Sequence, residues 1–217
     1  NGRRKKGSKS RRRSIAREMT AIQFLIRYKS ENYLRKIREA LESGCKWIQL
    51  QVNDNENNDE AIKAVADIKA ICRKHEAMII VEGCNSLAQK AEVDGVFNDS
   101  ANPEEIRDAR KSLGEGYIIG VFANNYSSIS SAQKSGADYV CVGPFGKSPE
   151  ALNAEDYQNI TSQLHENGQS IPVVAFGEIA VEDETFLVAS GIDGVALNAE
   201  TNCKNGIKET LESFLNC

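Results

Sequence analysis

Polar side chains and glycines follow a series of short apolar runs along this chain, and these are the residues best placed to do chemistry. The candidate binding residues are Gln49, Gln51, Asn53, Glu82, Asn124, Lys147, Ser148, Gly177 and Asn198. A lysine can hold an anion, and a glycine at the end of a strand lets a ligand approach the backbone closely. The pattern predicts a binding site for a small molecule, which could be phosphorylated.

The elements that must position these residues repeat at a regular interval. Strands are expected at residues 22–27, 47–52, 77–81, 94–97, 117–121, 138–142, 172–175 and 193–197, with amphipathic helical stretches between them. This alternation is typical of parallel βα units, and eight of them in 217 residues predict a single (β/α)₈ TIM barrel in the α/β class. Barrel enzymes work at the end where the strands stop. We therefore expect one cavity there, surrounded by Gln49, Glu82, Asn102, Asn124, Lys147, Gly177 and Asn198.

Three short turns support the barrel over a doubly wound sheet. Gly-Ala-Asp-Tyr (136–139), Gly-Ile-Asp-Gly (191–194) and Val-Asp-Gly (93–95) each lead into an expected strand. They look like copies of one αβ turn, as repeated βα units would supply. A doubly wound sheet would normally carry a glycine-rich phosphate turn after its first strand, where Tyr28, Lys29 and Ser30 stand here.

The first residues differ in composition from everything after them. Residues 1–17 hold nine lysines or arginines and no acid, which leaves 18 basic and 31 acidic groups in the other 200 residues, a net charge of −13. We expect residues 1–18 to form a disordered basic arm and residues 19–217 to form the barrel. The arm either binds nucleic acid or an anionic surface, or is non-native sequence ahead of Met19. The second interpretation is favoured because no aromatic residue interrupts the charges.

Composition excludes several classes of function. Hydrophobic residues make up 41% of the chain, enough for a core, and no apolar run approaches the roughly 18 residues that a membrane span needs. The acidic barrel offers no basic stripe, so nucleic acid is an unlikely partner. The six cysteines show no metal-binding spacing, and we expect reduced thiols and a cytoplasmic location. A homo-oligomer is compatible with all of these features.

Four segments together carry a resemblance to a known family. They are Gly-Cys-Lys-Trp-Ile-Gln-Leu (44–50), Val-Asp-Gly-Val (93–96), Gly-Ala-Asp-Tyr-Val with Gly-Pro-Phe (136–145) and Ile-Pro-Val-Val-Ala-Phe-Gly-Glu-Ile (171–179). In this order they resemble the thiamine phosphate synthase family, which includes the related thiazole tautomerases. The resemblance extends over residues 22–214 and implies a transferase that joins a pyrimidine-methyl diphosphate to a thiazole phosphate in thiamine biosynthesis, with Mg²⁺ as cofactor and pyrophosphate as leaving group.

The residues that the resemblance would make functional are largely replaced. The family pattern has Gln-Leu-Arg-x-Lys after strand two, and here Gln51 and Asn53 stand in place of both cations. Its two metal-binding aspartates correspond to Gly83 and Asn102, so the ligands for Mg²⁺ are missing. The phosphate turn Gly-Gly-Ile has become Gly177-Glu178-Ile179, and a serine of the strand-eight cradle corresponds to Asn198. Restoring Gln51→Arg, Asn53→Lys, Gly83→Asp and Asn102→Asp together is expected to raise diphosphate affinity.

Two functional interpretations remain open. In the first, the chain is a thiamine phosphate synthase-like transferase with weak or no activity. In the second, it is a non-catalytic or repurposed barrel that binds a less charged small molecule or a protein partner. Glu82, Asp99 and Glu178 would repel a diphosphate unless cations screen them.

A few single residues could still do chemistry. Glu82 and Asp99 could form a new cation site, and Lys147 could hold an anion. Cys84 lies at the functional end but has no histidine nearby to activate it, and Cys141 is expected in the core. His75 and His165 both fall at helix ends on the opposite face, which argues against a catalytic imidazole and against the tautomerase interpretation.

Overall fold

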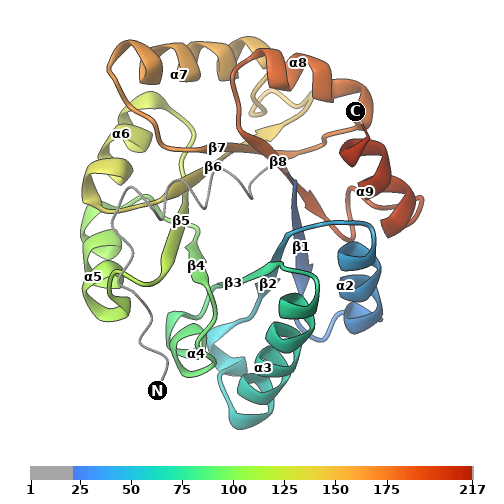
Figure 1. Cartoon of the computed structure of the whole chain (residues 1–217). Coiled ribbons are helices and arrows are strands. Elements are labelled where there is room, and N and C mark those ends of the chain that lie inside the picture. Colours follow the sequence, from blue (N-terminus) through green and yellow to red (C-terminus); the bar gives the residue numbers. More distant parts are fainter. Residues whose placement is uncertain (1–21, 217) are drawn as a thin grey trace.

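Eight parallel strands close into a barrel, and helices surround it (Figure 1). The computed structural model describes residues 22–216. The strands are β1 (Ile22–Arg27), β2 (Trp47–Gln51), β3 (Met78–Glu82), β4 (Gly95–Asn98), β5 (Ile118–Phe122), β6 (Tyr139–Phe145), β7 (Val173–Gly177) and β8 (Gly194–Asn198). Each pairs with its neighbours in chain order, and β8 returns to β1 to close the sheet. The prediction of a single (β/α)₈ barrel is confirmed. The expected basic arm at residues 1–18 lies outside the described residues.

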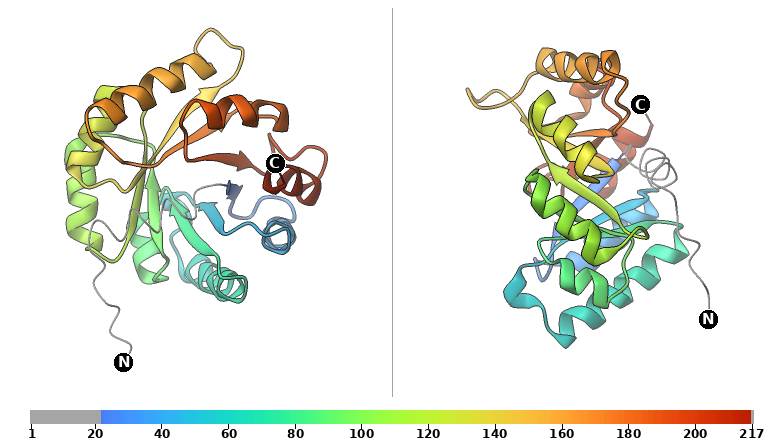
Figure 2. Two further views of the ribbon diagram at one scale, coloured as in Figure 1. Left: turned by 45° about the horizontal axis from the view of Figure 1, so that its top comes forward. Right: turned by 90° about the vertical axis from the view of Figure 1, so that its left-hand side faces the viewer.

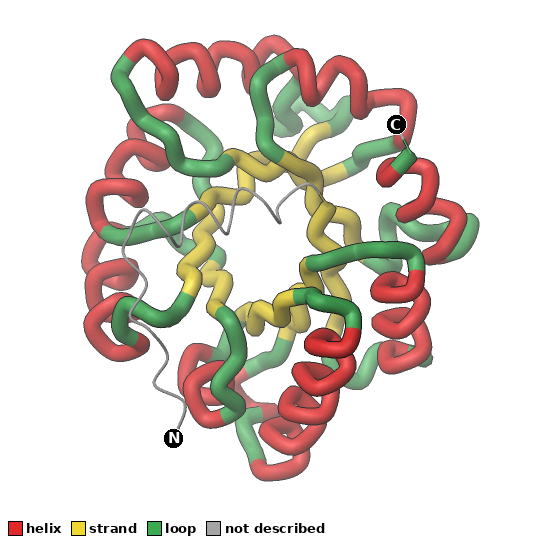
Figure 3. The backbone as a smooth tube through the Cα atoms, in the orientation of Figure 1, coloured by secondary structure: helices red, strands yellow, loops and turns green. Residues whose placement is uncertain are grey.

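A helix follows every strand, as the tube in Figure 3 makes clear. The helices are α2 (Tyr33–Glu42), α3 (Asp59–Lys74), α4 (Asn85–Lys90), α5 (Pro103–Leu113), α6 (Tyr126–Ser135), α7 (Ala154–Glu166), α8 (Glu184–Ala189) and α9 (Ile207–Leu215), with 3₁₀ turns η1 (Asp54–Glu56) and η2 (Val181–Asp183). None of the described helices is long and apolar enough to cross a bilayer. Asn58, Asn102, Asn125 and Asn153 cap α3, α5, α6 and α7 by accepting a backbone N–H bond.

The starts of six strands differ from the prediction by one residue, and for three of them the structure gives a physical cause. Strands β3 to β8 each begin one residue later than the apolar pattern predicts. Ahead of β4, β6 and β8 the residue in question is an aspartate whose side chain reaches across to the neighbouring strand. Asp94 accepts from Ile79 N at 2.9 Å, Asp138 from Ile119 N at 3.0 Å, and Asp193 from Val173 N at 2.9 Å. The three predicted turns therefore form the same contact at the amino-terminal end of the barrel.

Two of these aspartates also hold an arginine. Arg110 from α5 pairs with Asp138 at 2.5 Å, and the same guanidinium donates to the carbonyls of Gly114, Tyr117 and Gly136. Asp138 is fully buried and the Arg110 side chain is 11% exposed. Arg73 from α3 makes a bidentate pair with Asp94 at 2.7 and 3.1 Å. Ion pairs with several hydrogen bonds, such as these two, fix the relative positions of helix and strand as well as neutralising the aspartate.

The hydrophobic core has two layers, because successive strand residues point to opposite faces of the sheet. Ile79 and Val81 of β3 point outward into the shell between strands and helices, whereas Met78 and Ile80 point into the barrel. Trp47 and Tyr139 fill the barrel interior with an edge-to-face contact at 5.0 Å between ring centroids. This filling closes the lower part of the barrel, so any ligand must bind near the ends of the strands.

The fold also gives the positions of the two histidines and of five cysteines. His75 follows α3 and His165 lies in the last turn of α7, both at the amino-terminal end of the barrel, as predicted. The five cysteines in the described part of the chain are buried free thiols. Burial raises the pKa of the Cys84 thiol, and it raises that of Cys45 to about 11. Neither thiol is therefore prepared for nucleophilic attack at neutral pH.

Candidate functional site

A cavity of about 230 Å³ opens at the carboxyl ends of the strands. Every strand contributes one side chain to it, and Asp99 adds a ninth from the loop after β4. The lining residues are Leu25, Gln49, Glu82, Phe97, Asp99, Phe122, Cys141, Phe176 and Ala196. Right-handed βα units bring all eight strand ends to one side, so residues up to 171 positions apart in the chain meet here. This central cavity is the candidate site.

Glu82 is the central polar group of the cavity. Its Oε2 accepts from Gln49 Nε2 at 2.8 Å, and its Oε1 accepts from Gln51 Nε2 at 3.3 Å. The Tyr139 hydroxyl in turn donates to Gln49 Oε1 at 3.3 Å. Burial raises the pKa of Glu82 and the charge of Asp99 adds to this effect, while the two amides oppose it. The carboxylate is thus held in place by neutral donors.

The rest of the central cavity is apolar and largely aromatic. Phe97 is buried, and Phe122 and Phe176 are partly exposed to the cavity. The rings of Phe122 and Phe176 meet edge to face with centroids 5.8 Å apart. Cys141, which was predicted in the core, is buried and also lines the cavity. Burial strongly raises the pKa of its thiol. Below it, the amide Nε2 of fully buried Gln23 has no hydrogen-bond partner among the described residues.

The turn after β8, where a phosphate cradle was expected, is closed by its own side chains. Asn198 Oδ1 accepts from Glu200 N at 2.8 Å and from Thr201 N at 3.2 Å. Asn202 Oδ1 accepts from Asn198 N at 2.9 Å. These are the backbone donors that an anion would need at such a turn, and each already has an acceptor.

The turn after β7 is closed in a similar way. Gly177 has φ of 131°, and a Cβ there would meet the Phe145 carbonyl oxygen, so the position requires glycine. The next N–H, that of Glu178, donates to the same carbonyl at 2.8 Å. Asn202 Nδ2 ties the turn to the β8 loop by donating to Gly177 O at 2.9 Å and Ile179 O at 3.3 Å. Glu178 itself is exposed and adds a negative charge at this place.

The two positions that correspond to metal-binding aspartates do not fit Mg²⁺. Gly83 offers no side chain, and its φ of 90° with Val52 O only 2.8 Å from an ideal Cβ leaves little room for one. Asn102 Oδ1 is engaged as the cap of α5, where it accepts from Glu104 N at 2.9 Å. Among the described residues, no group of three histidine, cysteine or carboxylate side chains could hold a metal ion. The structure thus argues against the Gly83→Asp part of the expected restoration.

The remaining predicted site residues lie at the same end of the barrel but do not line the central cavity. Gln51 is exposed beside Glu82, and Asn53 begins η1, where its N–H donates to Glu56. Asn124 is exposed and lines a shallow surface pocket beside α6 and α7. Lys147 and Ser148 are exposed on the loop after β6, which projects from the barrel on the same side as η1 in the right-hand view of Figure 2. Of the seven residues expected to surround one cavity, only Gln49 and Glu82 line it.

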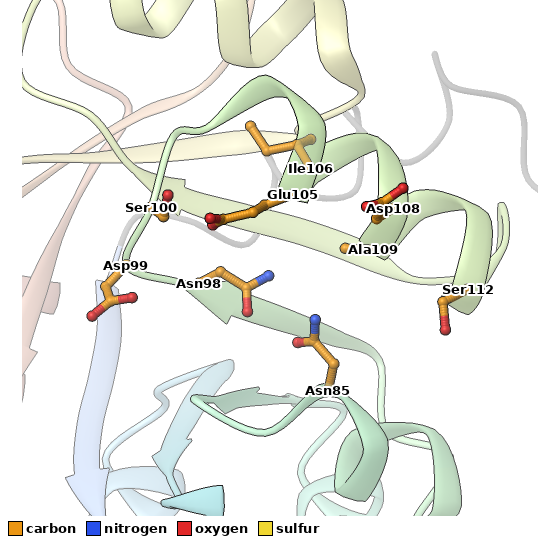
Figure 4. Close-up of a pocket in the computed structure, with 9 residues that line it drawn as sticks. All are labelled: Asn85, Asn98, Asp99, Ser100, Glu105, Ile106, Asp108, Ala109 and Ser112. Carbon is orange, nitrogen blue, oxygen red and sulfur yellow. The ribbon is translucent and has the colours of Figure 1, made fainter.

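A separate groove of about 450 Å³ runs beside the central cavity, between α4 and α5. Figure 4 shows Asn85, Asn98 and Glu105 facing this groove, with Asp108 and Ser112 further along α5. Asp99 lines both the groove and the cavity. The groove is acidic, and the sequence pattern gave no indication of it.

The sequence interpretation missed the apolar half of the site and one cation. Leu25, Phe97, Phe176 and Ala196 line the cavity, and strand alternation places them on the same face as Gln49. Applying that alternation to each predicted strand would have found them. Arg27 ends β1 beside Gln51, but it pairs with Glu56 at 3.5 Å. Lys29 likewise pairs with Glu60 at 3.1 Å.

Comparison with known proteins agrees with the resemblance. Residues 19–200 match the family model described as thiamine monophosphate synthase. A thiamine-phosphate synthase of Bacteroides fragilis is 40% identical over 190 residues, covering 83% of this chain and 91% of the relative. One of Bacteroides thetaiotaomicron is 37% identical over 189 residues, covering 83% and 88%.

Solved structures give the same fold. The thiamine phosphate pyrophosphorylase from Pyrococcus furiosus superposes with a TM-score of 0.76 at 22% identity, covering 92% of this chain and 96% of that one. The family model and the Bacteroides relatives span most of the barrel, including the strands and the αβ turns described above. This chain therefore belongs to the thiamine monophosphate synthase family.

Proposed function

We propose that this chain is a thiamine phosphate synthase-like barrel without synthase turnover, and that its central cavity binds a small ligand of low negative charge. The observation that carries the proposal is the closed turn after β8. Asn198 Oδ1 accepts from the two backbone N–H groups, of Glu200 and Thr201, that would otherwise face a phosphate. A phosphate would have to displace the Asn198 side chain from both N–H groups before it could bind there.

The charges at this end of the barrel support the same conclusion. Glu82 and Asp99 line the cavity and Glu178 follows β7, and by the family resemblance Gln51 and Asn53 replace two cations. Arg27 and Lys29 are already paired with Glu56 and Glu60. Lys147 is exposed on the β6 loop and does not line the central cavity.

The expected loss of rate is large. A leaving pyrophosphate needs compensation of its charge in the transition state. Each missing charge-assisted contact would cost roughly 2–4 kcal/mol of transition-state stabilisation, or about 30- to 1000-fold in rate. Even if the losses do not add, synthase turnover should fall by several orders of magnitude.

A synthase assay tests this directly. The chain is incubated with the pyrimidine-methyl diphosphate, the thiazole phosphate and Mg²⁺, and turnover is compared with that of a relative that keeps the Gln-Leu-Arg-x-Lys run. We expect turnover near background, and no Mg²⁺-dependent tightening of pyrophosphate binding in calorimetry. Turnover within about tenfold of the relative would overturn the proposal, and would mean that other groups have taken over the phosphate and metal roles.

A further inference from the structure

We infer that the central cavity selects a small planar organic cation, held against aromatic rings and near the Glu82 carboxylate. This inference rests on the proposed function, because it takes the central cavity rather than the phosphate turns as the ligand site. It goes further by assigning the sign of the ligand's charge and the groups that recognise it.

The first line of support is the aromatic wall. Phe97, Phe122 and Phe176 come from β4, β5 and β7 and line the cavity, Phe97 directly beside Glu82. Phe122 and Phe176 are locked edge to face, so the pair presents both a ring face and a ring edge. A cation within about 6 Å of an aromatic centroid is attracted by the electron density of the ring face, most strongly where water is excluded.

The second line of support is the charge of the lining. Glu82 and Asp99 are its two carboxylic acids, and among residues 22–216 no lysine, arginine or histidine lines the cavity. Glu82 is partly buried, and the donors to its two oxygens are the neutral amides of Gln49 and Gln51. A carboxylate removed from water without a counter-ion is under-compensated. A cationic ligand supplies that charge, whereas a neutral ligand does not and an anion is repelled.

The third line of support is that this carboxylate is held in position before any ligand arrives. Gln49 is fixed at both ends, since its Nε2 donates to Glu82 and its Oε1 accepts from Tyr139. Tyr139 is fully buried and is itself packed against Trp47 and Phe97. A preorganised acceptor loses little freedom on binding. The volume of about 230 Å³ admits one ring with a short substituent.

Three probes of nearly equal shape test the sign of the charge. Benzamidinium is cationic, benzamide is neutral and benzoate is anionic, and each is titrated into the folded full chain by calorimetry at neutral pH. We expect benzamidinium to bind at least about tenfold more tightly than benzamide, and benzoate to bind most weakly, since a charge-assisted hydrogen bond is worth about twice a neutral one.

Matched variants then locate the effect. Glu82→Gln keeps the size of the side chain and removes its charge, so benzamidinium affinity should fall about tenfold or more while benzamide affinity changes little. Phe122→Leu should weaken benzamidinium about three- to thirtyfold. Glu105→Gln, an equal charge change in the neighbouring groove, should leave all three affinities unchanged. Circular dichroism verifies that each variant is folded.

The outcomes separate this inference from the proposed function. Equal affinity for benzamide and benzamidinium, tighter binding of benzoate, or no binding of any probe would overturn the charge selection. A Glu105→Gln effect as large as that of Glu82→Gln would also overturn it, because the preference would then come from the overall field. The proposed function fails separately, if the chain turns over both thiamine precursors.

Discussion

At the amino-terminal end of the barrel three aspartates from three different turns make one and the same contact, whereas at the carboxyl-terminal end each loop is closed in its own way. Asp94, Asp138 and Asp193 each accept the N–H of the first or second residue of the preceding strand. At the other end, Asn198 caps its own turn, Glu178 donates to Phe145, and Asn53 pairs with Glu56.

The difference shows which constraint acts on each end. The amino-terminal turns must hold neighbouring strands in register, and one solution serves wherever the βα unit repeats. In barrel enzymes the carboxyl-terminal loops are constrained by ligand binding and not by strand pairing, so they can change without loss of the fold. In this chain the three amino-terminal turns share one contact, whereas the carboxyl-terminal loops share none.

The largest expected effect is at the amino-terminal end. Asp138→Ala removes the buried partner of Arg110 and the acceptor for Ile119 N. Breaking a buried pair by removing one member costs about 3–5 kcal/mol, which for a chain of this size lowers Tm by roughly 6–20 °C. Urea and thermal unfolding measure this loss. Glu178→Ala, at the exposed turn of the opposite end, is the control and should change stability by less than about 0.5 kcal/mol. Equal losses would mean that the two ends do not differ.

A second pair of variants asks whether the lost metal positions can be rebuilt. Gly83→Asp places a Cβ 2.8 Å from Val52 O at a φ of 90°, and such strain costs about 1–3 kcal/mol. Asn102→Asp keeps the cap of α5, because aspartate caps helices as well as asparagine does, and should cost less than about 0.5 kcal/mol. Urea unfolding of both variants and of the parent measures these losses of stability. A Gly83→Asp variant as stable as the parent would show that the backbone there adapts and that the aspartate can be restored.

A smaller effect is expected from opening the turn after β8. Asn198→Ala frees the N–H groups of Glu200 and Thr201, so inorganic phosphate should bind about tenfold more tightly than to the parent chain. Asn198→Asp keeps an acceptor in the turn and adds a negative charge, and it should show no gain. Calorimetric titration with phosphate compares the three proteins. A gain in Asn198→Asp, or none in Asn198→Ala, would argue that the closed turn is not what excludes phosphate.

The smallest effect concerns pH. Burial raises the pKa of Glu82, so the folded protein holds this proton more tightly than the unfolded chain does. The stability contributed by the group is therefore fully present below its ordinary pKa and is lost as the pH rises through the raised value. Glu82→Gln removes that dependence, and its stability relative to the parent should rise as the pH increases above about 4, the ordinary range of a glutamate. Urea unfolding of both proteins at several pH values measures the difference between their free energies of unfolding. A difference that stays constant with pH would contradict this prediction.

Much of the fold could be predicted because its signals are local. Alternating apolar residues located all eight strands, and Gly136 and Gly191 marked helix ends that the structure places at φ of 114° and 86°. The starts of β4, β6 and β8 were wrong by one residue, because an aspartate that bonds the next strand through its side chain has no apolar signature.

The site was less predictable because it depends on which side chains share a space. Gln49 and Glu82 were expected in one cavity and do line it. Asn124 and Lys147 also follow strands, but they point into solvent, since a few residues beyond the last strand pair the chain turns outward to its helix.

The sequence by itself determined the barrel and the family, because the alternation of strands and helices and the order of the matching segments are both read along the chain. Only the tertiary structure decided that Asn198 and Asn202 close the turns after β7 and β8 and that three phenylalanines from separate strands line one cavity with Glu82. These contacts join residues far apart in the chain. Their geometry is set by closure of the sheet, which brings eight strand ends around one axis.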